Sequence, residues 1–472
     1  MLNNRMFERR EKRAAQGELF VMGSDLPEAT PDAFYRRVNR TLDSMNFARQ
    51  VWEICQSAYA DTSRGGRPGI DPVVYLKMLM VGFFEDLPSE RAIASRCADS
   101  FSIRGFLGYE LTESTPNHSS LSVIRERLSV DQLRALHVVL LKALYDHGLL
   151  KGKKLGIDSS IIEANASLRA LQHRNTEENY WEYVKNLARE AGIDPEDIKA
   201  VRRFDKKRKG RKTSNAEWVN PYDPEAKVGR TKDGAADMVY KPEHVTDLES
   251  GAIVRVEVRS GDAGDTEGMS ERVMDAVQLV AQAMPRKEHD QIAQSVCADE
   301  GYFAVAEVEA LQTAQCRVVI GDPHAARRRA NASKEEKKVL RTARCAVKSA
   351  SGKALLRLRG EYVERGFCHV LDHGGLRRAT LCGRTKLTKR YYVAAMTFNL
   401  SLLLRQVFGI GTPKQWLAAR EGAPLALLLV VVRCWQVVRQ HFDDIFEHGW
   451  PLRALDRRLV GGRRIGYSST GC

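Results

Sequence analysis

KLGIDSSII, residues 154–162, is an apolar run that is interrupted by one acidic residue, Asp158. It follows about 150 residues with a helical pattern, so it marks a change in the type of structure. Further strand-like runs alternate with a helix over Glu267–Met284, and they cover Ala236–Val245, Ala252–Val258, Gln294–Ala298 and Cys316–Ile320. Glu249-Ser250-Gly251 is suited to a hairpin turn between the first two of these. This alternation predicts a mixed α/β sheet.

Two aspartates stand where strands of this sheet are expected to end. Asp158 lies in the first strand, and Asp299 follows a later one in VCADEGY, residues 296–302. Carboxylates beside buried strands are costly unless a cation compensates them, and magnesium prefers oxygen ligands. A single aspartate at such a position is more often a turn cap, so the spacing alone leaves both interpretations open.

The first 150 residues are expected to form helices. Pro72–Asp86 is apolar enough for a buried helix, and Ser129 with Gln132 makes a capping-box pattern ahead of a leucine-rich run. Ser119–Leu128, which carries Arg125 and Arg127, is the best candidate for the second helix of a DNA-binding helix-turn-helix. Many surface helices expose two arginines, so the alternative is an ordinary solvated helix.

The composition favours a polyanionic partner. The chain of 472 residues has a formal net charge of +14, although an ordinary basic enzyme would also fit. The longest apolar stretch, Ala423–Val432, is too short to span a bilayer and is interpreted as a buried helix, so no membrane partner is expected. Nine scattered cysteines without a C-x-x-C pair indicate reduced thiols in a cytoplasmic chain.

Two basic segments are candidate contacts to DNA phosphates, and solvated insertions are the alternative. Residues 199–213 carry nine basic side chains against one acidic, and a second cluster begins at Arg327. The candidate residues are Lys206, Lys207, Arg208, Lys209, Arg211, Arg327, Arg328 and Arg329.

The remaining pattern predicts a charged interruption over Arg327–Lys348, a helix that begins near Gly360, a strand-like Arg378–Leu381 and helices from Lys389 to about His441. Three further polar residues have an ordinary structural role as their expected one. Asp262 and Asp265 are expected to cap a turn rather than assist a metal site, and His244 is expected to be a buried sheet residue.

Several motifs, taken together and in order, resemble the DDE transposases of bacterial insertion sequences. They are GIDSSIIEANASLRA, NPYDPEAKVGRTKDGAADMVYKPEHVTDLESGAIVRVEV, DAGDT, ADEGYF and RGEYVERGFCHVLDHGGLRRATLCGR. GRPGIDPVVYLKMLMVGFFEDLPSERAIASRCADSFSIRGFLG and STPNHSSLSVIRERL resemble the InsH-type N-terminal domain of such enzymes. The resemblance implies an RNase H-like catalytic fold that holds Mg²⁺, or Mn²⁺, through Asp158, Asp299 and Glu364.

The resulting expectation is an α/β protein with an all-α N-terminal DNA-binding domain. The expected parts are a basic arm over 1–18, the helical domain over 19–150, the catalytic domain over 151–400 with basic insertions near 199–235 and 325–350, and a helical region with a basic tail over 401–472. The resemblance implies double-stranded DNA as partner, at least a homodimer during reaction, and a place in the cytoplasm on the nucleoid. An inactive DNA-binding repressor and an RNase H-type nuclease are the rival functions.

Overall fold

The structure is a computed structural model that describes residues 30–59, 69–110, 112–208, 214–231 and 233–419. Its described residues up to Pro413 form one compact unit, and from Lys414 on only residues 414–419 are described. The predicted arm over 1–18 and the buried helix over Ala423–Val432 therefore lie outside the described residues. The predicted boundaries at residues 150 and 400 stay predictions.

The first part of the chain is helical, as expected. The helices are α1 (Thr30–Ser44), α2 (Phe47–Cys55), α3 (Pro72–Phe84), α4 (Glu90–Asp99), α5 (Phe101–Leu107), α6 (His118–Arg127) and α7 (Val130–Asp146). Helix α3 is apolar on all sides and almost wholly buried, because α2, α4, α5, α6 and α15 surround it. The predicted capping box at Ser129 and Gln132 starts α7.

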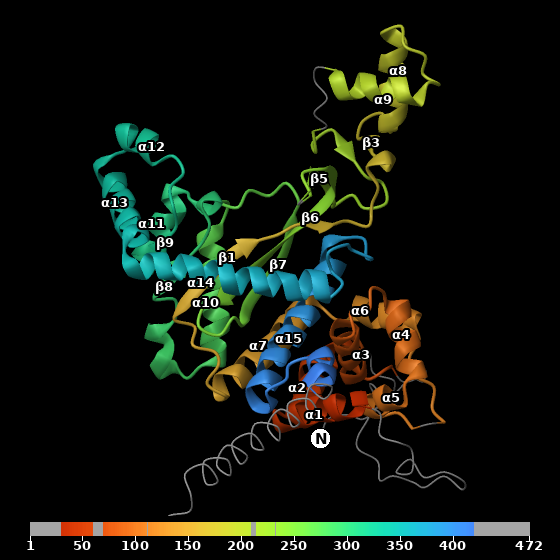
Figure 1. Ribbon diagram of the computed structural model, residues 1–472, viewed down its shortest axis with the longest axis vertical. Coiled ribbons are helices and arrows are strands. Elements are labelled where there is room, and N and C mark those ends of the chain that lie inside the picture. Colours follow the sequence, from red (N-terminus) through yellow and green to blue (C-terminus); the bar gives the residue numbers. More distant parts are fainter. Residues whose placement is uncertain (1–29, 60–68, 111, 209–213, 232, 420–472) are drawn as a thin grey trace, which may run out of the picture. The chain divides into compact units, whose positions relative to one another are not determined.

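A mixed sheet follows (Figure 1). Its strands are β1 (Lys154–Ser159), β2 (Ile162–Glu163), β5 (Lys227–Arg230), β6 (Ala236–Asp247), β7 (Ile253–Ser260), β8 (Ser295–Cys297) and β9 (Arg317–Val319). Strands β1, β6 and β7 pair antiparallel, whereas β8 and β9 add to the other edge of β1 in parallel. The order β7-β6-β1-β8-β9 is the arrangement expected of an RNase H-like fold.

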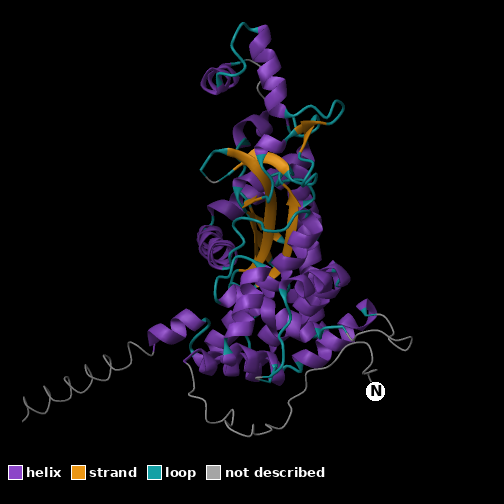
Figure 2. Cartoon of the chain, turned by 90° about the vertical axis from the view of Figure 1, so that its right-hand side faces the viewer, coloured by secondary structure: helices purple, strands orange, loops and turns teal. Residues whose placement is uncertain are grey.

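Helices cover this sheet, as Figure 2 shows in its view of orange strands enclosed by purple helices. The covering helices are α10 (Met269–Ala283), α11 (Val305–Thr313), α14 (Ala350–Phe367) and α15 (Arg384–Phe408). Helix α15 binds β7 directly, because the Asn399 side chain accepts a hydrogen bond from Ile253 N and donates one to Ile253 O, at 2.9 and 2.8 Å. Helix α7 reaches the same strand through His137. The N-terminal helices and the sheet therefore share one core.

Helix α15 is also apolar and largely buried. By length and composition, the helix over Arg384–Ala419 could cross a membrane, and 67% of its most apolar window is buried inside the protein. It packs on α7, β7 and α3, so its apolar side chains are explained by the core of this unit.

The insertion between β2 and β5 has a small core of its own. It holds β3 (Gln172–His173), α8 (Tyr180–Glu190), α9 (Ile198–Lys207) and β4 (Trp218–Val219). Val184, Ala188 and Val201 are fully buried between the two helices, and partly buried aromatic residues surround them.

Three expectations about the later chain were wrong. The charged segment is helical, because α12 (Ala325–Asn331) and α13 (Lys334–Lys348) bury Val339, Leu340 and Ala343 beneath their charged face. Helix α14 begins at Ala350, where Ser349 caps it, and not near Gly360. Arg378 makes only an isolated bridge to Glu163, so Arg378–Leu381 is not a strand.

Candidate active site

The two predicted aspartates lie at the carboxyl ends of adjacent parallel strands. Leu155 pairs with Val296 and Gly156 with Cys297, so the same register, continued for two residues, sets Asp158 level with Asp299. The Asp158 side chain is only 19% exposed, whereas Asp299 is 62% exposed. The two carboxylates therefore lie at one edge of the sheet, because parallel neighbours end at the same edge.

A guanidinium group lies between the two carboxylates. Arg359 on α14 donates to Asp158 Oδ2 at 2.6 Å, and its Nη2 atom is 4.0 Å from Asp299 Oδ2. Burial raises the pKa of Asp158 to about 6, while the Arg359 charge and the Ser159 backbone N–H act against that rise. The carboxylates of Asp158 and Asp299 therefore lie on either side of one positively charged group, the Arg359 guanidinium.

A third acidic residue, Asp265, lies beside them. Its Oδ1 atom accepts a hydrogen bond from Ser159 Oγ at 2.9 Å and pairs with Lys241 Nζ at 2.6 Å. Its negative charge contributes to the raised pKa of Asp158. Asp265 thus does more than cap a turn, whereas Asp262 only accepts from Ser260 Oγ, as expected for a turn cap.

A buried ion cluster holds the segments that carry these residues. Glu243, opposite Ser159 in the sheet and fully buried, pairs with Arg272 at 2.6 Å and Arg259 at 3.4 Å. The same arginines donate to the backbone carbonyls of residues 264, 265 and 267, which fixes the loop of Asp265. Tyr302, three residues after Asp299, donates to Glu243 at 3.1 Å.

Glu364 does not join the two aspartates in this structure. Arg359 and Val363, four residues apart on α14, face β1, because Arg359 reaches Asp158 and Val363 lies against Gly156. Glu364 is the next residue around the helix, and it is exposed. Among the residues that the structure describes, no three histidine, cysteine or acidic side chains are grouped to hold a metal ion.

Two transposase family models match most of the chain. A family model described as "Transposase domain (DUF772)" matches residues 25–127, and one described as "Transposase DDE domain" matches residues 193–400. The chain belongs to the DDE transposases. The match to the DDE domain includes Asp299 and Glu364, and it begins after Asp158.

Similarity of this transposase to individual known proteins is weak. No curated protein matches it. One solved structure that it resembles is described as "Crystal structure of the Mos1 mariner paired end complex with Mn". Identity is 12%, with 67% of this chain and 82% of that chain covered, and a TM-score of 0.19 is too low to support any argument.

The candidate DNA contacts in the N-terminal part of the transposase separate into two kinds. The predicted recognition helix is present as α6, but its Arg125 is buried and forms an ion pair with Glu90. Arg125 was therefore wrongly predicted to reach DNA, since its charge is used inside the protein. Arg127 is exposed and lies over the Tyr59 ring, 5.5 Å from its centroid.

The candidates of the two basic segments differ in the same way. Lys206 and Lys207 are exposed at the end of α9, whereas Arg208 turns back to Asp205 at 2.8 Å and is not free for DNA. Arg327 is exposed. Arg328 is half-buried, but its Nε atom lies 3.7 Å from Asp322 Oδ1, too far for a hydrogen bond, so its guanidinium donors stay available. Lys209 and Arg211 lie outside the described residues, as does the side chain of Arg329.

Four residues at the site were not predicted to act there: Lys241, Glu243, Arg272 and Arg359. Lys241 and Glu243 are two charged residues on one strand, and this pattern could have indicated that they belong to a site. Charged residues are unusual inside a buried strand. His244, as expected, is a buried sheet residue. Its Nε2 atom lies 2.6 Å from Tyr391 Oη, and burial lowers its pKa to about 3.

Proposed function

We propose that this transposase cuts the DNA at the ends of its insertion sequence and joins them to target DNA at the Asp158–Asp299 edge of the sheet. The observation that carries the proposal is the alignment of these two carboxylates around the Arg359 guanidinium. Water opens the phosphodiester at the element end, and the freed 3′-hydroxyl then attacks the target phosphodiester. Both steps need the same positioned charges and no covalent enzyme intermediate.

Mg²⁺ or Mn²⁺ fits this donor set. The available atoms are carboxylate oxygens, which hard divalent cations prefer, and a cationic side chain already lies between two of them. Bound as a pair, such ions stabilise the attacking and leaving oxygens of an in-line phosphoryl displacement. Asp158 and Asp299 are the proposed ligands from the geometry, and Glu364 is proposed as the third on the family resemblance alone.

DNA is proposed to run along the exposed basic side chains of the same molecule. Arg127, Lys206, Lys207 and Arg327 are exposed, so they can contact backbone phosphates. Lys209, Arg211 and Arg329 remain proposed contacts. Since both element ends react together, we propose at least a homodimer in the reaction complex, acting on the nucleoid in the cytoplasm.

The test compares Asp299→Asn with Asp262→Asn on duplexes that carry the flanking ends of the element. Asparagine keeps the size of the side chain but removes the anionic ligand, so Asp299→Asn should lower nicking and strand transfer by orders of magnitude. Its gel-shift affinity for the same DNA should stay near that of the wild type. Asp262→Asn, a change in an exposed turn cap, should cost little.

Normal cleavage by Asp299→Asn would refute the metal assignment. One observation favours a second candidate, a DNA-binding repressor without catalysis, because Glu364 is exposed and does not join the aspartates. That candidate predicts tight binding of the ends and no nicking by the wild type in Mg²⁺. An RNase H-type nuclease would nick these duplexes but would not join the ends to target DNA.

A further inference from the structure

A cavity of about 320 Å³ lies beside the Asp299 segment. Helices α12 and α13 and the start of α11 form its walls. The lining residues are Val305, His324, Arg327, Arg328, Ala332, Glu336 and Leu340. Three of these seven side chains carry nitrogen donors that are suited to an anion.

Its position relative to the proposed site follows from the sheet. Cys297 pairs with Val319 in parallel, so the continued register sets Asp299 level with Gly321 at the end of β9. A Cβ on Gly321 would lie 2.9 Å from the Glu300 side chain, which shows how closely the two strand ends approach. Both chain segments that leave these strands line the cavity. Val305 follows β8, and His324 follows β9.

Arg328 is fixed on the segment that contains Asp299. Its guanidinium carbon lies 5.0 Å from the centroid of the Phe303 ring, and Phe303 is four residues after Asp299. Its Nε atom is 3.7 Å from Asp322 Oδ1, and the backbone N–H of His324 donates to the same oxygen at 2.9 Å. A stacked, anchored guanidinium loses little freedom when it binds an anion.

The acidic member of the lining is held by the backbone. Glu336 is part of a capping box, in which its Oε2 atom accepts a hydrogen bond from Ser333 N at 2.7 Å. Arg327 and His324 are exposed, so their donors are accessible from solvent. Val305 and Leu340 provide the apolar part of the lining.

We propose that this cavity binds one backbone phosphate of the DNA strand that enters the Asp299 edge. The proposal rests on the proposed function and adds a specific position to it: Arg327 and Arg328 hold a phosphate next to the reacting one, on the β9 side. Arginine forms paired hydrogen bonds with phosphate oxygens, and such contacts set the register of the strand without reading its sequence.

The test is a methylphosphonate scan of a duplex made from the DNA that flanks the coding region. Each phosphate near the end is neutralised in turn, and the affinity is measured by gel shift in EDTA, so that no cleavage occurs. The wild type should bind roughly ten-fold more weakly at one position, because a charged hydrogen bond can no longer form there. Arg327→Gln should bind the unmodified duplex more weakly and should show no further weakening at that position.

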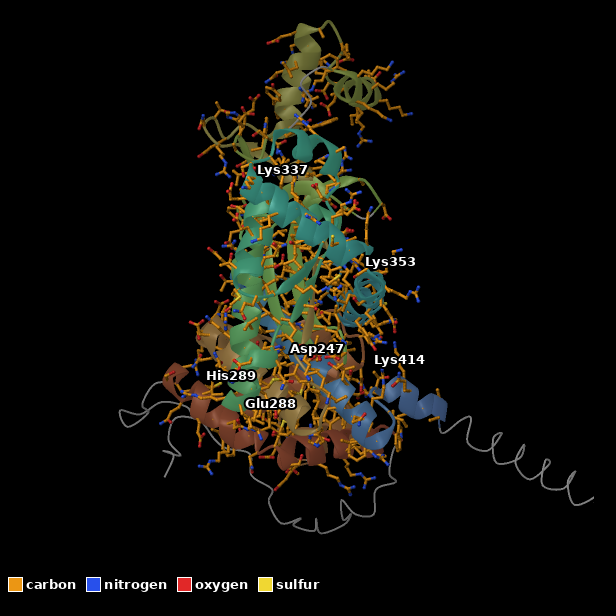
Figure 3. The ribbon with its side chains drawn as sticks, turned by 90° about the vertical axis from the view of Figure 1, so that its left-hand side faces the viewer. Asp247, Glu288, His289, Lys337, Lys353 and Lys414 are labelled. Carbon is orange, nitrogen blue, oxygen red and sulfur yellow. The ribbon has the colours of Figure 1, made fainter. Side chains whose placement is uncertain are left out.

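Lys337→Gln is the matched control, because Lys337, labelled in Figure 3, is exposed on α13 and is not one of the residues that line the cavity. It should keep the wild-type scan. A scan that is unchanged in Arg327→Gln, or a wild type without a sensitive position, would overturn the proposal. If the wild type shows the expected scan but does not nick in Mg²⁺, the proposed function fails and the phosphate site stands. If the wild type does not bind this DNA at all, both fail.

Discussion

Arg359 is the residue that most changes the interpretation of the site. It brings a positive charge to Asp158, a mostly buried carboxylate whose pKa burial raises to about 6. Its approach needs α14 to lie close to β1, and Gly156 permits this, because a Cβ there would lie 2.7 Å from Leu248 Cδ2 and 3.2 Å from Val363 Cγ2. A small residue on the strand thus allows the helix to deliver the arginine.

If Arg359 occupies the position of a cation, its removal should make the protein respond more strongly to one. Arg359→Gln leaves the two aspartates without their counter-charge, so the variant should melt at a lower temperature than the wild type in EDTA. Added Mn²⁺ should raise its melting temperature by more than it raises that of the wild type, because the ion no longer competes with the guanidinium. Differential scanning fluorimetry at several Mn²⁺ concentrations measures both effects.

The control for this experiment is Arg357→Gln, an exposed arginine two residues earlier on α14. Its melting temperature should respond to Mn²⁺ as the wild type does. Equal responses of Arg359→Gln and wild type would show that the guanidinium is a structural partner of Asp158 and no substitute for a metal ion.

At the scale of elements, the sequence predicted the strands better than the helices that cross them. The strand-end positions of Asp158 and Asp299 could be predicted, but their closeness could not, because it depends on the parallel pairing of β1 with β8 that the structure shows. The start of α14 was misplaced by ten residues, since Gly352 and Gly360 weaken the helical pattern. The approach of Arg359 to the aspartates was missed for the same reason.

Arg125 shows a second limit of the sequence. The pattern of α6 revealed an arginine on a helix next to a turn, and it revealed nothing of Glu90, which lies 35 residues earlier. Whether a surface-type residue faces water or a partner depends on tertiary packing. Long-range ion pairs such as Arg125–Glu90 and Glu243–Arg272 are therefore the part of this fold that periodicity could not predict.

The junction between α7 and β7 should make stability depend on pH. His137 is fully buried, its Nε2–H donates to Ile253 O and Val254 O, and burial lowers its pKa to about 4. Its pKa in the unfolded chain is about 6.5, so the unfolded state takes up a proton first as the pH falls. The stability contributed by neutral His137 is therefore present above about pH 6.5 and is lost between that value and about pH 4.

At about pH 5 this loss should amount to about 2 kcal/mol for His137. His137→Gln keeps an N–H donor but cannot be protonated, so its free energy of unfolding should fall by about that much less between about pH 7.5 and about pH 5. Urea denaturation at the two pH values measures the difference. His118→Gln, a change at an exposed histidine, should leave the pH dependence unaltered, and an equal effect of both variants would contradict the assignment.

At the scale of the whole molecule, the chain has a formal net charge of +14, and its basic residues have two different roles. Part of it neutralises buried acids, as Arg272 and Arg259 do at Glu243 and Arg359 at Asp158. The part that stays exposed, including Lys206 and Lys207 on the insertion, is available for DNA. Net charge alone therefore overstates the electrostatic contact with DNA, and exposure decides which residues contribute.

Salt dependence can separate these two uses of charge. The double substitution Lys206→Gln, Lys207→Gln should weaken binding of any duplex and reduce the slope of log K against log salt by roughly 0.9 for each phosphate that the variant no longer neutralises. Affinity should fall equally for element ends and unrelated sequences, because phosphate contacts carry no sequence information. Gel-shift titrations over a range of salt concentrations, with both kinds of duplex, measure slope and specificity together.

The matched control is Lys142→Gln with Lys287→Gln, which removes two exposed lysines, one on α7 and one in the turn ahead of β8. Glu288 and His289, labelled in Figure 3, belong to the same turn as Lys287, and Tyr145 of α7 donates to Glu288 at 2.8 Å. Both double variants lower the net charge equally, so a nonspecific field effect would change both slopes alike. Only a slope change confined to Lys206 and Lys207 supports direct contact, and an unchanged slope would make the insertion a solvated surface.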